Sequence, residues 1–275
     1  MSSLFDLTGK VAIVTGSTKG IGQGIARRLA EHGANVMVSS RSQADCDAVA
    51  ADISRECGRD AAVGQAFDLH DLDSVKRLVE VTVRRFGGLD VVVLNAAKTD
   101  ILGFANDTTP ADFQAMLNAN IVNNTELALA AHPHFLDRGG GALIFIASIS
   151  GTGSSVSTSA YSVCKRALFQ LVDNFAVEWG PQKIRVNAVA PGLTISEDTR
   201  AFWQNPDTKA AFGAAIPMGR WAEPDDMAAA CVWLASPGGA MVTGQTVVID
   251  GGLTMRGANQ QAADFKALKA AAAAK

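Results

Sequence analysis

The stretch Thr15-Gly16-Ser17-Thr18-Lys19-Gly20-Ile21-Gly22 decides the fold of this chain. Residues 11–14 before it are apolar at successive positions, as in a strand covered on both faces, and residues 21–32 after it follow a helical pattern. Glycines between a strand and a helix let backbone N–H groups approach a pyrophosphate at the positive end of the helix. The turn therefore predicts a dinucleotide site. A P-loop is excluded, because no GK[ST] ends the turn.

The rest of the chain alternates between the same two patterns. Short apolar runs predict strands at 11–14, 35–39, 61–67, 91–94, 142–147, 185–190 and 246–249. Amphipathic stretches predict helices at 21–32, 44–55, 74–86, 110–136, 160–179 and 224–234. This alternation predicts an α/β fold, a doubly wound, mostly parallel seven-stranded Rossmann-type sheet with helices on both faces.

The domain organisation follows from where this pattern is interrupted. No Pro/Ser-rich linker or block of charge divides the chain, so we expect a single domain over residues 1–257. Residues 193–222 are the longest interruption, and loops of that length usually act as lids over a site. Residues 258–275 form an Ala- and Lys-rich tail that is either a native helical end or a remnant of cloning.

Composition excludes several classes of partner. The 275 residues are 48% hydrophobic with a net charge of −3, so a basic surface for nucleic acid is not expected. No apolar run reaches the roughly 18 residues of a membrane span, and the N-terminus lacks the pattern of a signal peptide. The four cysteines are scattered without ligand spacing, which predicts free thiols, no metal site and a cytoplasmic setting.

A second group of residues points to proton transfer. Tyr161 and Lys165 are four positions apart, hence on one face of the expected helix, and Tyr161 is the only tyrosine in the chain. Alone, the two could be an ordinary surface pair. Ser148, however, ends the fifth expected strand, at the edge where α/β sheets bind ligands, and Asn120 lies in the preceding helix. A phenol, an ammonium and a hydroxyl beside a dinucleotide predict an acid–base site.

Taken together, these motifs resemble the short-chain dehydrogenase/reductase family. The likeness runs from about residue 7 to residue 254, and it is nearest to carbonyl reductases, ketoacyl reductases and hydroxysteroid-type dehydrogenases. One departure is Leu94-Asn95-Ala96-Ala97, where the family commonly has NNAG. The residues that carry the resemblance are Thr15–Gly22 as TGxxxGIG, Asn95, Asn120, Ser148, Tyr161-x-x-x-Lys165, Pro191-Gly192 and Asp250-Gly251-Gly252.

The resemblance implies a role for each of these residues. Tyr161 would be the general acid or base, and Lys165 would lower the Tyr161 pKa and bind the nicotinamide ribose. Ser148 would hold the substrate oxygen, and Asn120 would position a water that relays protons. Asp68 would contact the adenine or, alternatively, cap the next helix. The cofactor-binding set is Gly16, Ser17, Lys19, Gly20, Ile21, Gly22, Ser40, Arg41, Asp68, Leu69, Asn95, Ala96, Tyr161, Lys165, Pro191, Gly192 and Thr194, and the substrate set is Ser148, Tyr161 and Trp203.

The end of the second expected strand predicts which dinucleotide is used. An enzyme that selects NAD generally has an acid there, which repels a 2′-phosphate. This chain has Ser40 followed by Arg41, and Lys19 lies in the glycine turn. Both cations could bind a phosphate, so NADP(H) is expected in preference to NAD(H), unless both are merely solvated surface charges.

The expected activity is therefore NADP(H)-dependent interconversion of a ketone or aldehyde and an alcohol. Apolar side chains in residues 193–222 favour a small apolar or aromatic substrate, and the resemblance implies a homotetramer. Two alternatives stay open: a sugar-nucleotide-modifying enzyme on the same fold, and a dinucleotide-sensing regulator without catalysis. Ketone-dependent oxidation of NADPH would distinguish an enzyme from a sensor.

Overall fold

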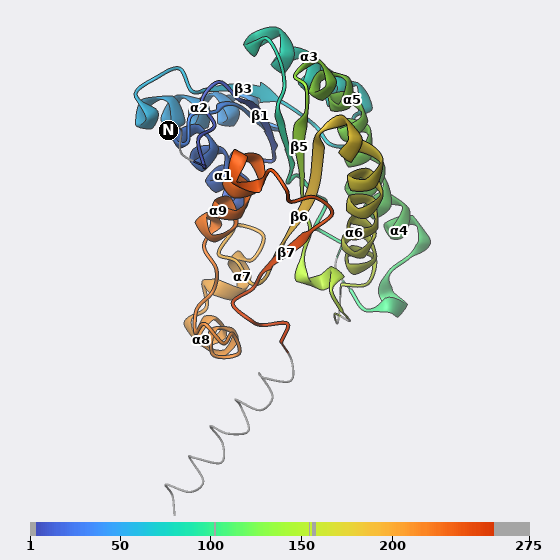
Figure 1. Cartoon of the computed structure of the whole chain (residues 1–275). Coiled ribbons are helices and arrows are strands. Elements are labelled where there is room, and N and C mark those ends of the chain that lie inside the picture. Colours follow the sequence, from blue (N-terminus) through green and yellow to red (C-terminus); the bar gives the residue numbers. More distant parts are fainter. Residues whose placement is uncertain (1–3, 102, 154, 156–157, 256–275) are drawn as a thin grey trace, which may run out of the picture.

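Seven parallel strands form the centre of the molecule (Figure 1). In the computed structural model, residues 4–101, 103–153, 155 and 158–255 are described. The strands are β1 Val11–Thr15, β2 Asn35–Ser40, β3 Ala62–Ala66, β4 Val91–Leu94, β5 Gly141–Ile146, β6 Ile184–Pro191 and β7 Thr246–Ile249. Their order is β3-β2-β1-β4-β5-β6-β7, so the seven predicted strands and the doubly wound Rossmann-type topology are confirmed.

Helices cover both faces of this sheet. On one face α1, α2 and α9 pack over alternate side chains of the strands, and on the other face α3, α5 and α6 do so (Figure 1). The inner strands β1 and β4 are buried along their whole length, which explains why they are apolar at successive positions. The helices are α1 Gly20–Glu31, α2 Gln43–Cys57, α3 Leu72–Phe86, α4 Pro110–Leu117, α5 Asn124–Asp137, α6 Ser159–Trp179, α7 Arg200–Trp203, α8 Pro206–Ala214 and α9 Pro224–Ala235.

The helix predicted over residues 110–136 is present, but its hydrogen-bond pattern changes in the middle. The chain runs through α4, then a π-helical segment at Asn118–Asn123, then α5. The start of α4 is as predicted, because Thr109 and Asp112 form a capping box around Pro110. The π-helical segment widens the helix at Asn120, and such segments often occur at functional sites.

Residues 193–222, for which a lid is predicted and which are called the lid segment below, contain structure that the sequence did not reveal. Two short helices, α7 and α8, lie within it below the sheet (Figure 1). Its two ends are tied together, because the N–H of Ile195 donates to the Ala222 carbonyl and the N–H of Ala222 donates to the Leu193 carbonyl, both at 2.9 Å. The lid segment is thus a closed loop on a fixed base. The tail at 258–275 lies outside the described residues.

None of the helices described above combines the length and the apolar composition that crossing a bilayer requires.

Candidate active site

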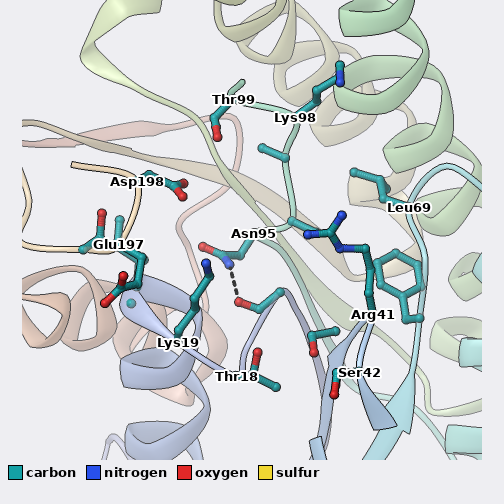
Figure 2. Close-up of a pocket in the computed structure, with 18 of the residues that line it drawn as sticks. Thr18, Lys19, Arg41, Ser42, Leu69, Asn95, Lys98, Thr99, Glu197 and Asp198 are labelled. Carbon is teal, nitrogen blue, oxygen red and sulfur yellow. Dashed lines mark hydrogen bonds between the residues drawn. The ribbon is translucent and has the colours of Figure 1, made fainter. Parts of the chain in front are cut away.

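A cavity of about 550 Å³ opens at the carboxyl ends of β1, β2 and β4 (Figure 2). The strand order reverses between β1 and β4, and α/β sheets bind ligands in the crevice at such a reversal. The volume is within the range of small-molecule and cofactor sites. Five segments line it: residues 16 and 18–21, residues 40–42 and 45, residues 67–70, residues 95–100, and residues 196–198 of the lid segment.

The glycine turn between β1 and α1 is built to let a ligand approach the backbone. Gly16 and Gly20 have φ values of +63° and +54°, which favour glycine. A Cβ on Gly22 would lie 2.3 Å from the Gly16 carbonyl oxygen, so no side chain fits there. No side chain caps the first turn of α1, which begins after Lys19. The exposed N–H groups and the helix dipole therefore suit a pyrophosphate, and the residues present fit a dinucleotide.

Two side chains brace this turn from beneath. Ser17 is buried, and its hydroxyl donates to the Val14 carbonyl at 2.6 Å and accepts from the Ser39 N–H at 2.9 Å. Asn95, after β4, donates from Nδ2 to the carbonyls of Thr15 at 2.9 Å and Gly16 at 3.1 Å. The side chain of Ser17 consequently supports the turn, whereas Asn95 both supports the turn and lines the cavity.

The end of β2 forms the cationic side of the cavity. Arg41 and Lys19 are exposed and line it, and in Figure 2 the Lys19 ammonium points into the cavity. Neither makes a hydrogen bond or ion pair through its side chain with the residues that the structure describes. Ser42 caps α2 by accepting from the N–H of Asp45, an acid that also lines the cavity. Both predicted cations are thus available to a ligand at this end.

The end of β3 forms the next part of the wall. Asp68 lines the cavity, and its Oδ1 accepts from the N–H of His70 at 2.9 Å. The cap of α3 is Asp71, whose side chain accepts from the N–H of Asp73, so the alternative interpretation of Asp68 as the helix cap is wrong. Leu69 also lines the cavity, and its carbonyl accepts from the buried Asn123 side chain at 2.7 Å.

Ser148, Tyr161 and Lys165 come together beside the cavity. Ser148 follows β5, and its side chain is close enough to the Tyr161 phenol to lower the pKa of that phenol. Lys165 is only 4% exposed, lies 5.5 Å above the centre of the Tyr161 ring and donates to the Ile146 carbonyl at 2.8 Å. The spacing of four places Tyr161 and Lys165 on one face of α6, as predicted. The structure thus brings the three residues into one cluster.

Burial controls the ionisation of this cluster. It raises the pKa of Tyr161 to about 12, partly opposed by the neighbouring Ser148 side chain. It also lowers the pKa of Lys165 to about 8. Burial thus outweighs the lowering contribution, which comes from Ser148. That Lys165 lowers the Tyr161 pKa stays a prediction. At neutral pH the phenol keeps its proton and can donate it.

The Asn120 side chain hydrogen-bonds to the backbone of the loop that follows β4. Its Oδ1 accepts from the N–H of Lys98 at 3.0 Å, and its Nδ2 donates to the Lys98 carbonyl at 3.1 Å. It lies in the π-helical segment and is buried, and its own carbonyl accepts from Asn124. The Asn120 side chain thus fixes the loop at residues 95–100, which lines the cavity. The predicted water relay stays a prediction.

The remaining predicted residues hold the lid segment. A Cβ on Gly192 would lie 2.6 Å from the Cβ of Asp250, so the chain can pass there only as glycine. Thr194 is buried and donates to the Gly192 carbonyl at 3.1 Å. Trp203 donates from Nε1 to the Ser196 carbonyl at 2.7 Å. Of the predicted cofactor residues, those outside the lining of the cavity are Ser17, Gly22, Tyr161, Lys165, Pro191, Gly192 and Thr194.

Comparisons with known proteins bear on this site. A family model described as enoyl-(acyl carrier protein) reductase matches residues 16–254. The human protein named dehydrogenase/reductase SDR family member 4 is 37% identical over 254 residues, covering 91% of this chain and 89% of the human one. The chain belongs to the short-chain dehydrogenase/reductase family. It is an oxidoreductase by that membership, and the predicted resemblance is confirmed.

Solved structures of the family share this fold. A putative NAD(P)-dependent gluconate 5-dehydrogenase from Beutenbergia cavernae, with bound NADP at low occupancy, has a TM-score of 0.85 at 31% identity, covering 92% of this chain and 100% of that one. A 7α-hydroxysteroid dehydrogenase complexed with NADH and 7-oxo glycochenodeoxycholic acid has a TM-score of 0.85 at 28% identity, covering 90% and 96%. Family members with this fold thus bind NADP in one case and NADH in the other.

Several cavity residues of this dehydrogenase/reductase were missed from the sequence. Some directly follow a strand beside a predicted residue, so position alone could have found them: Thr18, Ser42, Phe67, His70, Ala97, Lys98, Thr99 and Asp100. Asp45, in the first turn of α2, and Ser196, Glu197 and Asp198, in the lid segment, had no comparable signal. The lid segment therefore contributes polar and acidic groups to the site, where only its apolar residues had been considered.

No cysteine is among the described residues that line the cavity. Cys46, Cys164 and Cys231 are buried and Cys57 is partly buried, and all four are free thiols, as predicted. Burial raises the pKa of Cys164, which keeps that thiol protonated although it is adjacent to Lys165 in the sequence. Within the described ranges, no group of three or more His, Cys, Asp or Glu side chains is arranged to hold a metal ion.

Proposed function

We propose that this dehydrogenase/reductase interconverts a ketone or aldehyde and an alcohol with NADP(H), with Tyr161 as the general acid and base. The observation that supports this most is the cluster of Ser148, Tyr161 and Lys165 beside a cavity with a pyrophosphate-binding turn. A sensor needs the turn but has no use for a buried ammonium held against a phenol. That arrangement favours catalysis over the regulatory alternative.

The protein's own groups would handle the proton. A nicotinamide cofactor would supply or accept the hydride. In the reductive direction, Ser148 would hold the carbonyl oxygen and the Tyr161 phenol would donate its proton to that oxygen as charge develops. Lys165, with its pKa of about 8, is mostly protonated at neutral pH and would stabilise the phenolate left behind. In the oxidative direction the phenolate would accept the alcohol proton.

Different residues of the site would bind different parts of a dinucleotide. The turn at residues 16–22 would bind the pyrophosphate, and Asp68 and Leu69 would contact the adenine. Asn95 and Ala96, with Pro191, Gly192 and Thr194 at the base of the lid segment, would lie towards the nicotinamide end, near Tyr161 and Lys165. Arg41 and Lys19, both exposed and unpaired among the described residues, support a preference for NADP(H), because Ser40, the last residue of β2, carries no charge to repel a 2′-phosphate.

An apolar or aromatic substrate is supported by the lid segment. Phe202 and Phe212 are 47% and 42% exposed, and Phe212 packs edge-on against both Phe202 and Trp221. Trp203 is held to the Ser196 carbonyl, next to the lining of the cavity. Such a surface can gain by covering an apolar ligand.

The homotetramer and the cytoplasmic setting stay predictions. On the helices α5 and α6, the apolar residues Leu127, Leu168 and Val172 are buried in the core of their own chain. Leu129 on α5 is 49% exposed and would be available to a second copy.

Initial rates of NADPH oxidation with a panel of ketones and aldehydes test the function. We expect ketone-dependent oxidation that is saturable in both substrates, with apolar or aromatic ketones used more efficiently than phosphorylated sugars. A protein that binds NADPH but oxidises it with no carbonyl in the panel would contradict the proposal and favour a sensor.

A further inference from the structure

A rigid turn of the lid segment carries a carboxylate into the cavity. The turn spans residues 196–199, between β6 and α7. The Thr199 hydroxyl accepts from the Ser196 N–H at 3.1 Å and donates to the Thr194 carbonyl at 2.5 Å, and the Trp203 indole donates to the Ser196 carbonyl at 2.7 Å. The backbone of the turn is therefore fixed, and Asp198 is presented from a defined position.

Asp198 is an acid without a partner among the described residues on this side of the cavity, into which the unpaired Lys19 also points. Its neighbour Glu197 accepts from Arg200 at 3.0 Å, and Lys98 pairs with Asp100 at 2.9 Å. The Asp198 side chain has no hydrogen bond or ion pair with any residue in the described part of the chain, and it is exposed. In Figure 2 its carboxylate points into the cavity, on the side where Thr99 lies.

The carboxylate lies within electrostatic reach of the reacting groups. Its negative charge contributes to raising the pKa of Tyr161 and opposes the lowering of the Lys165 pKa. A carbonyl bound at Ser148 and Tyr161 would therefore lie in the field of Asp198, which lines the adjoining cavity. The cations that suit a phosphate, Arg41 and Lys19, belong to the end of β2 and the glycine turn.

We propose that Asp198 selects substrates that carry a cationic group, such as a protonated or quaternary amine, on an apolar or aromatic carbonyl compound, and disfavours substrates that carry a carboxylate or phosphate. This inference rests on the proposed function of the same site. An unpaired carboxylate attracts a cation and repels an anion by similar amounts, so it both selects and excludes. The apolar side chains of the lid segment would then contact the apolar part of a substrate, and Asp198 would attract its cationic group.

Three acetophenones of similar size test the inference, with para-trimethylammonium, para-tert-butyl and para-carboxylate groups. The readout is kcat/KM with saturating NADPH at low ionic strength, expressed as the ratio of each charged ketone to the neutral one. We expect the wild-type ratio to be about 5- to 10-fold in favour of the cation and similarly against the anion. In Asp198→Asn both ratios should move towards one.

Asp207→Asn is the matched control. Asp207 is an exposed acid of α8 on the same lid segment, and it does not line the cavity. The substitution makes the same change in net charge, so the control variant should keep the wild-type ratios. A change of the ratios in Asp207→Asn equal to that in Asp198→Asn would mean a diffuse charge effect and would overturn the proposal.

The outcomes separate this inference from the proposed function. Reduction of all three ketones with equal efficiency by the wild type would overturn the inference and leave the function standing. Failure to reduce any ketone would refute the function and the inference with it. If Asp198→Asn weakens binding of NADP⁺, measured by calorimetry, while the substrate ratios stay at wild-type values, the carboxylate serves the oxidised nicotinamide and the inference is wrong.

Discussion

Replacing Arg41 with alanine should remove most of the advantage of NADPH over NADH. The guanidinium lines the cavity at the end of β2 and has no partner among the residues described by the structure. A hydrogen bond to a charged group contributes about 1.5–3 kcal/mol, and water screens an exposed one. We therefore take a value just below this range, about 1.4 kcal/mol, and expect kcat/KM for NADPH to fall about tenfold while that for NADH is nearly unchanged.

A double variant should reverse the order of the two cofactors. Ser40→Asp with Arg41→Ala adds repulsion of a 2′-phosphate and removes attraction, and the new acid can hydrogen-bond the ribose hydroxyls of NADH. Lys19 remains on the other side of the 2′-phosphate position and limits the loss of efficiency with NADPH. Asp45 already contributes a negative charge to the same end of the cavity.

The assay compares initial rates with NADPH and NADH at one fixed, saturating concentration of ketone. Arg84→Ala is the control, because Arg84 is an exposed cation on α3 that does not line the cavity. Equal efficiency of the wild type with both cofactors would refute the reasoning. A proportionate loss with both cofactors in Arg41→Ala would also refute it, since the 2′-phosphate is the feature that distinguishes them.

Four further predictions follow from the site. Tyr161→Phe should lower kcat by about 10²- to 10⁴-fold while fluorescence titration still shows NADPH binding, and retention of most of kcat would contradict the acid–base role. Gly22→Ala places a Cβ 2.3 Å from the Gly16 carbonyl oxygen, so the KM for cofactor should rise and stability should fall by about 1–3 kcal/mol; an unchanged Tm and KM would count against the proposed turn. Ketone reduction should decline as pH rises through about 8, because Lys165 loses its charge there. The Tyr161 phenol stays protonated over this range, since its pKa is about 12. A pH–rate profile that is flat between about pH 6 and 10 would contradict this prediction. Light scattering should give a mass four times the 28.6 kDa of the chain, and a monomeric mass at micromolar concentration would refute the tetramer.

The elements of the fold could be predicted from the sequence because their signals are local. Strands such as β4 are apolar at successive positions because both faces of the sheet are covered, and the glycines of the first turn are required by backbone geometry at each position. The spacing of Tyr161 and Lys165 by four likewise fixes their common face on any helix. These features depend only on residues that are near one another in the sequence, so they can be predicted without knowing how the rest of the chain packs.

The tertiary structure decided what depends on residues distant in the sequence. Asn120 lies in a π-helical segment and pairs with the backbone of Lys98, 22 positions earlier, which no helical periodicity reveals. The direction of the Tyr161 pKa follows from burial, which is a sum over many surrounding groups. The same holds for Asp198, because a carboxylate in a long loop faces solvent or a cavity according to where the loop is anchored, and here the anchors are Thr194, Thr199 and Trp203. Sequence by itself thus determined the elements and the reactive residue types, and long-range packing decided their charge states and what faces the cavity.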